Sequence, residues 1–144
     1  GWDGKEKDTL KNIRDTKEFT INIVSESFSQ QMVDCSTDFD SNIDEFEISG
    51  LHTSKSQKIQ PPRLKESKIS YECILNQIVE IGDGKAGSGF IVIGNIVLFH
   101  ISDDVISNDR IDVQKLNPIG RLAGDWYTRP TDNFKIMRKV KPDK

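Results

Sequence analysis

Two short segments near opposite ends of the sequence carry side chains suited to holding a charged or planar ligand. In the first, Lys7, Thr9 and Asn12 supply a cation and two neutral hydrogen-bond donors around the expected start of a helix. A helix N-terminus presents unpaired backbone N–H groups and partial positive charge, which together suit a phosphate. The same residues also fit an ordinary capped helix, so the pattern by itself leaves both interpretations open.

The second segment combines an arginine, glycines and two aromatic residues, and it runs from Arg121 through Trp126 to Tyr127. Such a mixture is typical of a site for a planar cofactor or of a subunit interface. A C-terminal segment that simply packs against a sheet would have the same composition. The residues alone do not distinguish these possibilities.

Other chemistry finds less support in the sequence. The glycine-rich segment 82–89 joins two expected strands and lacks the spacing of a phosphate-binding loop, so a hairpin turn accounts for it. The two histidines, His52 and His100, form no recognisable metal spacing, and no serine stands in a strand-to-helix elbow. The acids of residues 38–45 lack the glycine and final glutamate of a calcium-binding loop. We therefore assign no catalytic residue and no metal ligand.

Composition narrows the class of protein. The 144 residues are expected to form one domain over 1–144. A net charge of -3 argues against a nucleic-acid surface, which needs a concentrated positive field. No apolar stretch is long enough to cross a membrane, and two cysteines are too few for a disulfide framework. The expected location is the cytoplasm.

The elements that must position these residues begin with a helix. Asp8 is expected to cap it, with Leu10 and Ile13 on its buried face. Residues 18–24 alternate between apolar and polar, which predicts a half-buried strand. Ser25 is then expected to cap a second helix that runs to about Thr37.

A long β-hairpin is the firmest structural prediction. Residues 69–81 place apolar side chains, including Cys73, at alternate positions, and the glycine-rich turn 82–89 follows. Residues 90–101 are apolar on nearly both faces, as expected for an interior barrel strand that a helix or a partner subunit covers. Residues 38–68 are expected to be rich in loops, and 113–116 to form a short helix.

Taken together, the blocks along the chain resemble the flavin reductase-like family of FMN-binding split-barrel proteins. The resemblance covers almost the whole chain, in the order and at the spacings of that family. Its clearest part is the pair of blocks at the start, where a KDTLxNI motif precedes an EFVVNIVSE-like strand. The matching segments are Lys7–Ile13, Glu18–Glu26, Asp44–Glu47, Ser49–Leu51, Pro62–Ser67, Glu72–Cys73, Val92–Gly94, His100, Arg121–Gly124 and Tyr127.

The resemblance implies a mainly β, α+β fold: an antiparallel split barrel with a few flanking helices, assembled as a homodimer with FMN near the subunit interface. It also implies an oxidoreductase in which NAD(P)H reduces FMN, with a partner monooxygenase as one destination of the electrons. The helix-start group would contact the phosphate or ribityl chain, and the C-terminal group would line or cover the flavin from the same or the other subunit. The implied cofactor-binding residues are Lys7, Thr9, Asn12, His100, Arg121, Trp126 and Tyr127.

The sequence also departs from the family pattern. The family begins with two or three further strands, including an "RPI" strand and an "N.APFS.F" segment, and neither motif stands in this sequence. His100 would look the same if it were a structural histidine at a strand end. Two alternatives to a reductase therefore stay open: an FMN-binding electron carrier without reductase turnover, and a truncated copy that no longer binds flavin.

Overall fold

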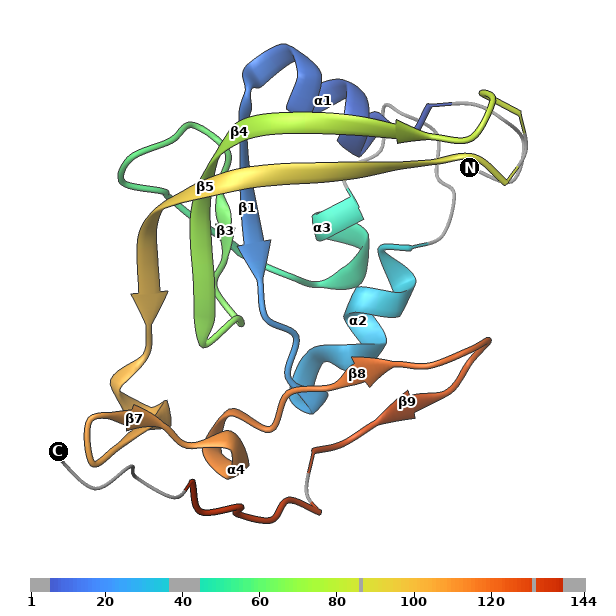
Figure 1. Cartoon of the computed structure of the whole chain (residues 1–144). Coiled ribbons are helices and arrows are strands. Elements are labelled where there is room, and N and C mark those ends of the chain that lie inside the picture. The colour runs from blue at the N-terminus through green and yellow to red at the C-terminus, as the bar shows by residue number, and fades with distance from the viewer. Residues whose placement is uncertain (1–5, 37–44, 86, 131, 139–144) are drawn as a thin grey trace, which may run out of the picture.

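A bent antiparallel hairpin organises the chain in the computed structural model, which describes residues 6–36, 45–85, 87–130 and 132–138. Strand β4 (Ile69–Ile81) pairs along its length with β5 (Gly89–Ile101), and β1 (Glu18–Asn22) pairs with the first half of β4. The strand order is β1-β4-β5 (Figure 1). The predicted hairpin is confirmed, and Gly82, Gly84 and Gly87 in its turn all have positive φ.

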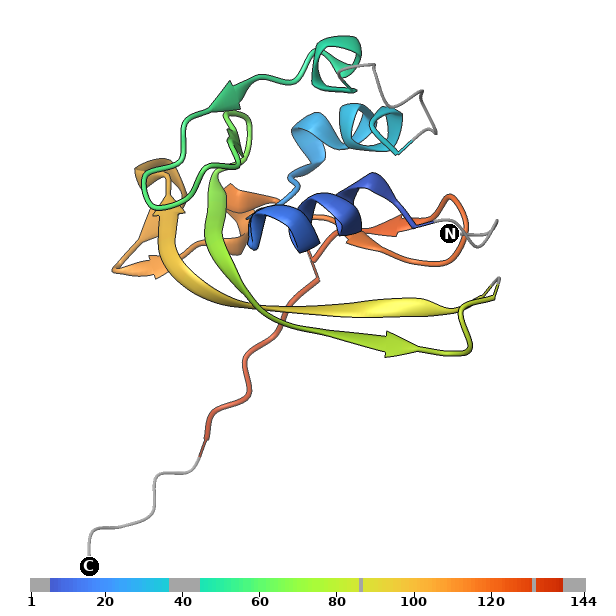
Figure 2. The ribbon, with the colours of Figure 1, turned by 90° about the horizontal axis from the view of Figure 1, so that it is seen from above.

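The hairpin bends where its register changes. The pairing of β4 with β5 shifts between Glu72 and Cys73 and again between Leu75 and Gln77. Extra residues in one strand of a pair bend it and increase its twist. The second half of the hairpin therefore swings away as an arm, which Figure 1 and Figure 2 show from two sides.

Helix α1 (Asp8–Thr16) lies along this arm and buries Leu10 and Ile13, as predicted. The guanidinium of Arg14 lies 5.2 Å from the centroid of the Phe90 ring and forms 3.2 Å ion pairs with Glu6 and Glu80. The N-cap is Lys7, not the predicted Asp8, which instead occupies the first turn. Aspartate in that position favours the helix through the macrodipole without capping it.

The predicted second helix is shorter and begins differently. A 3-10 turn, η1 (Glu26–Phe28), leads into α2 (Ser29–Asp34), and Thr37 lies outside the described residues. Ser25 precedes η1 but makes no side-chain cap, and its buried Oγ has no hydrogen-bond partner. The cap prediction for Ser25 is therefore wrong. Helix α3 (Glu45–Ser49) follows; the acids at 38, 40 and 44 lie in the part of the chain that is not described.

The next segment is loop-rich, as predicted, with two short strands, β2 (Thr53–Ser54) and β3 (Arg63–Leu64). It is tied to β1 by polar contacts. The Thr20 hydroxyl donates to the Pro62 carbonyl at 2.9 Å, and the Leu64 N–H donates to Asn22 Oδ1 at 3.0 Å. The polar side chains of β1 thus hold this segment against the sheet.

The C-terminal part builds a small core against the start of β4. Its buried members are Ile69, Val105 and Leu116, with Ile23 and Tyr71 packed beside them. The predicted short helix is present as α4, where Asp112 accepts hydrogen bonds from two backbone N–H groups. The elements of this part are η2 (Asp103–Val105), β6 (Ile106–Ser107), β7 (Arg110–Ile111), α4 (Val113–Leu116), β8 (Gly120–Arg121) and β9 (Tyr127–Thr128).

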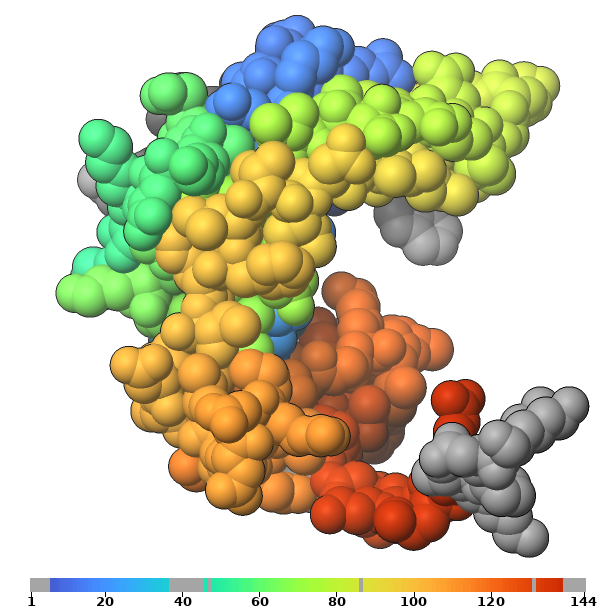
Figure 3. Space-filling view, turned by 60° about the vertical axis from the view of Figure 1, so that its left-hand side comes forward, coloured from blue at the N-terminus to red at the C-terminus, as the bar shows by residue number. Residues whose placement is uncertain are grey.

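The face and edge of β5 are more open than the sequence predicts. Residues 90–101 have the pattern of a covered strand, yet the described part of the chain leaves seven large apolar side chains of β5 between 38% and 57% exposed. Figure 3 shows a hollow between the hairpin arm and the segment around β8 and β9. The exposed set is Phe90, Ile91, Ile93, Ile96, Val97, Phe99 and Ile101.

Cys73 is buried with a free thiol, as expected for a small apolar residue, and its burial raises the pKa of that thiol. In the part of the chain that the structure describes, no helix combines the length and apolar character needed to cross a bilayer.

The packing of Phe19 against Gly94 gives a test of the bent sheet. A Cβ at Gly94 would lie 2.9 Å from Phe19 Cε1 and 3.3 Å from the Cys73 Cβ. We expect Gly94→Ala to lower the free energy of unfolding by about 1–3 kcal/mol through overpacking, measured by urea denaturation. Gly89→Ala on the same strand meets no atom within 4 Å and should change little. Recovery of stability in Phe19→Leu/Gly94→Ala would show that overpacking against the Phe19 ring causes the loss. Equal losses for Gly94→Ala and Gly89→Ala would contradict this explanation.

Candidate functional site

The structure separates the predicted binding residues into three places. Lys7, Thr9 and Asn12 are exposed on the first turns of α1. Arg121 and Tyr127 face each other across the β8–β9 pair, where they are register partners. Figure 1 shows α1 at the top of the molecule and the β8–β9 pair in its lower half, and Figure 3 shows a hollow between these two parts. His100, the third location, lies near the end of β5.

The N-terminus of α1 has the features that an anion requires. Lys7 adopts an extended N-cap conformation and makes no side-chain cap to the helix. The first backbone N–H groups therefore receive no hydrogen bond from a capping side chain, and they carry the positive end of the helix dipole. The hydroxyl of Thr9 and the ammonium of Lys7 lie in the same turn, while the Asp8 carboxylate is the one acidic group of that turn.

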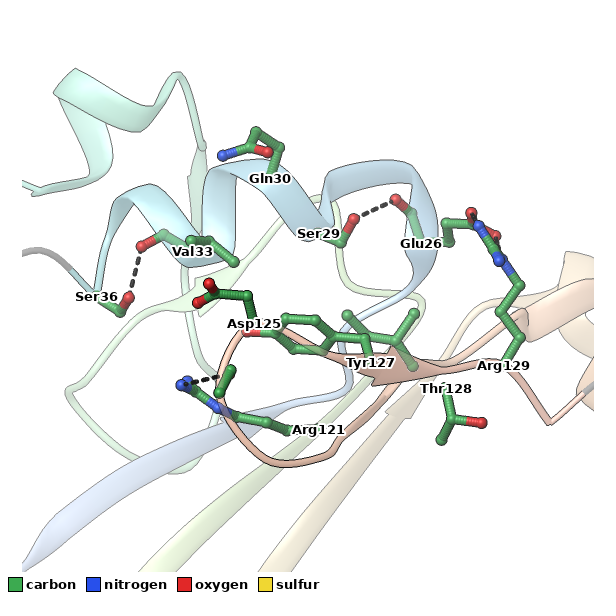
Figure 4. A pocket seen from close by; sticks show the side chains of 12 residues that line it. Glu26, Ser29, Gln30, Val33, Ser36, Arg121, Asp125, Tyr127, Thr128 and Arg129 are labelled. Carbon is green, nitrogen blue, oxygen red and sulfur yellow. Dashed lines mark hydrogen bonds and ion pairs between the residues drawn. The ribbon is translucent and has the colours of Figure 1, made fainter.

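A pocket of about 470 Å³ lies between α2 and the β8–β9 pair (Figure 4). This volume falls within the range of sites for small molecules and cofactors. Its walls combine two arginines, two acidic residues, a tyrosine and several neutral polar groups. The lining residues are Glu26, Ser29, Gln30, Val33, Ser36, Ile119, Arg121, Gly124, Asp125, Tyr127, Thr128 and Arg129.

Arg121 and Tyr127 form one unit in this pocket. The guanidinium carbon of Arg121 lies 5.8 Å from the centroid of the Tyr127 ring, within the range of a cation–π contact. Arg121 Nη2 also donates to the Gly124 carbonyl at 3.4 Å, which is a long hydrogen bond. Trp126 lies outside the pocket, and 75% of its surface is exposed. The predicted trio thus divides into two residues that line the pocket and one that does not.

The far wall of the pocket is fixed by an ion pair between η1 and the segment after β9. Arg129 Nε donates to Glu26 Oε2 at 2.7 Å, its Nη2 contacts Glu26 Oε1, and Asn117 Nδ2 donates to Oε2 at 3.1 Å. The hydrogen bonds from Arg129 and Asn117 lower the pKa of Glu26 to about 2. Sequence patterns gave no sign of this pair, since the two residues are 103 positions apart and the block that contains Glu26 does not extend to Arg129.

His100 is held by a buried carboxylate. Its Nε2 lies 2.5 Å from Oε1 of Glu72, whose side chain is fully buried. Glu72 also accepts hydrogen bonds from the backbone N–H groups of Gln57 at 2.8 Å and Lys58 at 2.7 Å. Burial raises the pKa of Glu72, but the hydrogen bonds from Gln57, His100 and Lys58 outweigh it, so the net effect is a lowered pKa.

This arrangement gives His100 a structural role, because together with Glu72 it ties the loop at 57–58 to the sheet. The alternation of residues 69–81 marks the odd positions as buried, and it gives no reason to expect that Glu72 is buried too. The relevant signal is the position of Glu72 between Tyr71 and Cys73 in the first half of the strand, since a carboxylate must find partners when it is buried. Within the described residues, no group of three or more His, Cys, Asp or Glu side chains is placed to hold a metal ion.

Comparison with protein families gives a match over most of the chain. A model described as "Flavin reductase like domain" matches residues 4–115. This range includes α1, the whole hairpin and α4 almost to its end, but not β8 and β9.

Individual proteins agree with this match. An uncharacterized protein from Aquifex aeolicus is 35% identical over 131 residues, which cover 90% of this chain and 64% of that protein. Nitrilotriacetate monooxygenase component B from Bacillus cereus has a structure that matches with a TM-score of 0.85 and 30% identity, over 92% of this chain and 66% of that one. The 2-nitrobenzoate 2-nitroreductase NbaA from Pseudomonas fluorescens matches with a TM-score of 0.79 and 33% identity, over 92% and 64%.

These matches confirm the predicted fold class, an antiparallel split barrel with flanking helices. They also show that this chain spans just under two thirds of the length of these proteins.

The Glu72–His100 contact gives a second test. We expect Glu72→Gln to lower the free energy of unfolding at pH 7 by about 3 kcal/mol, because it removes one partner of a buried hydrogen-bonded pair. Because the folded-state pKa of Glu72 is lowered from its ordinary 4.5, its contribution is present above that pH and is lost as the pH falls below it. As the pH is lowered, the free energy of unfolding of Glu72→Gln should therefore decrease less than that of the wild-type protein.

Glu66→Gln is the matched control, because Glu66 forms a similar contact with His52 at 2.8 Å, where the histidine side chain is 72% exposed. Denaturation between pH 3 and pH 7 should show a loss of less than about 1 kcal/mol for this variant. Equal losses of stability in Glu72→Gln and Glu66→Gln would mean that burial does not explain the contribution of Glu72 to stability.

Proposed function

Because this chain belongs to the flavin reductase like family, we propose that it is an FMN-binding oxidoreductase that passes electrons from NAD(P)H to FMN. The observation that carries the proposal is the family match over residues 4–115 together with the shared fold. The similar structures include a component of a monooxygenase and a nitroreductase, both of which are redox proteins by name. A monooxygenase that takes up the reduced flavin is accordingly the partner that we propose.

The phosphate end of FMN fits the start of α1. The uncapped first turn, the Lys7 ammonium and the Thr9 hydroxyl offer the backbone and side-chain donors that a phosphate accepts from. Asn12 lies one turn further along as an additional donor. These groups are exposed, so a phosphate can reach them from solvent.

The flavin ring fits the other group. Arg121 stacked against Tyr127 presents a flat surface and a positive charge in a pocket large enough for a cofactor. Since a hollow separates the arm beside α1 from the β8–β9 pair (Figure 3), we propose that one flavin meets α1 of one protomer and Arg121 of another. This places the cofactor at an interface of a homodimer.

FMN supplies the redox chemistry when it is bound, and the protein has to bind and orient it. The fixed charge of Arg121 would stabilise negative charge that develops on a nearby ring. The cation–π contact with the Tyr127 ring would help to hold the guanidinium in position. We assign no acid or base to the protein, because transfer of a hydride to a flavin requires none.

Two measurements test the function. The visible spectrum of the purified chain, recorded after incubation with FMN and gel filtration, shows whether flavin is retained. Steady-state oxidation of NADH and of NADPH then shows turnover. We expect a retained flavin band and oxidation of one nicotinamide. Full FMN occupancy without oxidation would favour the electron carrier, and failure to bind FMN by the folded protein would refute the proposal for this chain.

A comparison of FMN with riboflavin tests the two halves of the site separately. Lys7→Met should weaken FMN binding about tenfold, because it removes one charge-assisted hydrogen bond, and leave riboflavin binding unchanged. Arg121→Ala should weaken both ligands, because it acts on the ring. Affinities can be measured from quenching of flavin fluorescence.

Lys11→Met makes the same charge change on the same helix, one turn away from its N-terminus, and serves as the control. It should leave both affinities within about twofold, since the field of the helix terminus falls off within the first turn. If Lys7→Met and Lys11→Met weaken FMN equally, general electrostatic attraction explains the effect, and α1 does not hold the phosphate.

A further inference from the structure

The β8–β9 ribbon, defined as residues 120–128, carries Arg121 and Tyr127 and lies outside residues 4–115, the range that the family model matches. In the described chain, its hydrogen bonds join its own residues to each other, as when the Leu122 N–H donates to the Trp126 carbonyl at 2.9 Å. An isolated two-stranded hairpin is only marginally stable in water. The place of Arg121 and Tyr127 therefore depends on what holds the two ends of the ribbon.

Backbone hydrogen bonds hold the end where the ribbon begins. The Ile119 N–H donates to the Val24 carbonyl at 3.1 Å, and the Glu26 N–H donates to the Asn117 carbonyl at 3.1 Å. The chain just before β8 is thus fixed to the chain that enters η1. Because these bonds use backbone atoms alone, a change of the Glu26 side chain leaves their donors and acceptors in place.

The Glu26 side chain holds the end where the ribbon leaves. Arg129 directly follows β9, and its Nε donates to Glu26 Oε2 at 2.7 Å while its Nη2 contacts Oε1. Asn117, three positions before β8, donates to the same Oε2 at 3.1 Å. One carboxylate therefore receives donors from both sides of the ribbon and joins them to η1.

This contact acts directly on the pocket. Tyr127 and Arg129 are two positions apart at the end of β9, and residues at this spacing share one side of an extended chain. Both line the pocket, and Figure 4 shows Arg129 reaching Glu26 at one end of it. The Tyr127 ring in turn lies 5.8 Å from the guanidinium carbon of Arg121. A connected series of contacts thus runs from Glu26 to the pair that we propose meets the flavin ring.

The charges of the Glu26–Arg129 pair are permanent. Hydrogen bonds from Arg129 and Asn117 lower the pKa of Glu26 to about 2, so it is ionised at any pH near neutrality. An arginine side chain keeps its proton throughout this range. A two-point contact between a guanidinium and a carboxylate also fixes the relative orientation of the two groups. The pair is therefore suited to hold the ribbon in one position.

We propose that Glu26 is a positioning residue for the flavin ring, because it holds both ends of the β8–β9 ribbon and so sets the place of Tyr127 and Arg121. This inference rests on the proposed function, in which Arg121 and Tyr127 meet the ring. Glu26 acts through Arg129 and the ribbon, and the phosphate half of the site does not depend on it.

Hydrogen–deuterium exchange tests the anchoring without any flavin. Glu26→Arg places a like charge against Arg129, so we expect the amides of residues 119–128 to exchange about tenfold faster while those of β4 keep their rate. Glu26→Arg/Arg129→Glu restores a pair of opposite charges and should bring the ribbon to within about threefold of the wild-type rate. Wild-type exchange of the ribbon in Glu26→Arg would overturn the proposal.

Asp104→Arg is the matched control. It makes the same charge change and breaks another ion pair, the 2.8 Å contact between Lys68 and Asp104, which lies on η2 and does not line the pocket. The ribbon should keep its wild-type exchange rate in this variant. Equal acceleration in Asp104→Arg and Glu26→Arg would show that net charge controls the exchange, and the anchoring role of Glu26 would be refuted.

Quenching of riboflavin fluorescence tests the consequence for the ring, since riboflavin lacks the phosphate. Glu26→Arg should raise the riboflavin Kd about tenfold, because the arrangement that binds the ring is populated less often, and the charge-exchanged double variant should recover most of this loss. If Arg121→Ala weakens riboflavin binding and Glu26→Arg does not, the anchored ribbon does not serve the ring and the positioning role is overturned. A wild-type protein that binds no riboflavin would instead refute the proposed function, and the role of Glu26 at the ring with it.

Discussion

The buried carboxylate of Glu72 is the constraint on which the arrangement of the sheet and its covering loop depends. It accepts hydrogen bonds from Gln57 and Lys58 in the loop and contacts His100 on β5, so three segments meet at one charged group. A carboxylate without these partners would be costly to bury, because it has lost its water. The loop, β4 and β5 must therefore come together in one relative position for the chain to fold.

The hairpin bends directly after Glu72. Two register shifts turn its second half away from the part that β1 covers, and Gly94 lets the Phe19 ring pack where a side chain would collide. The bend carries α1 with the arm, because Arg14 contacts both Phe90 and Glu80. The result is a hollow between the arm and the β8–β9 part, and apolar side chains of β5 remain exposed.

The hollow between the arm and the β8–β9 part explains why the predicted binding residues of α1 and those of β8–β9 lie apart. The first turn of α1, which we propose holds the phosphate, lies beside the arm, whereas the Arg121–Tyr127 unit belongs to the C-terminal part, which the Glu26–Arg129 pair fastens to η1. Each part offers one half of the proposed flavin site, and a second chain is the simplest source of the other half. The proposed binding of flavin at an interface follows from this separation.

The sequence by itself determined the local features: the hairpin, the short helix 113–116, the buried face of α1 and the family pattern, because periodicity and turn residues act over a few positions. It did not determine the cap at Lys7 or the lost cap at Ser25, since caps depend on small changes of backbone angle. Only the tertiary structure paired Glu72 with His100 and Glu26 with Arg129, and only it placed α1 and the β8–β9 pair in different parts of the molecule. Contacts between distant positions are set by how strands register and bend, and no pattern within one segment contains that information.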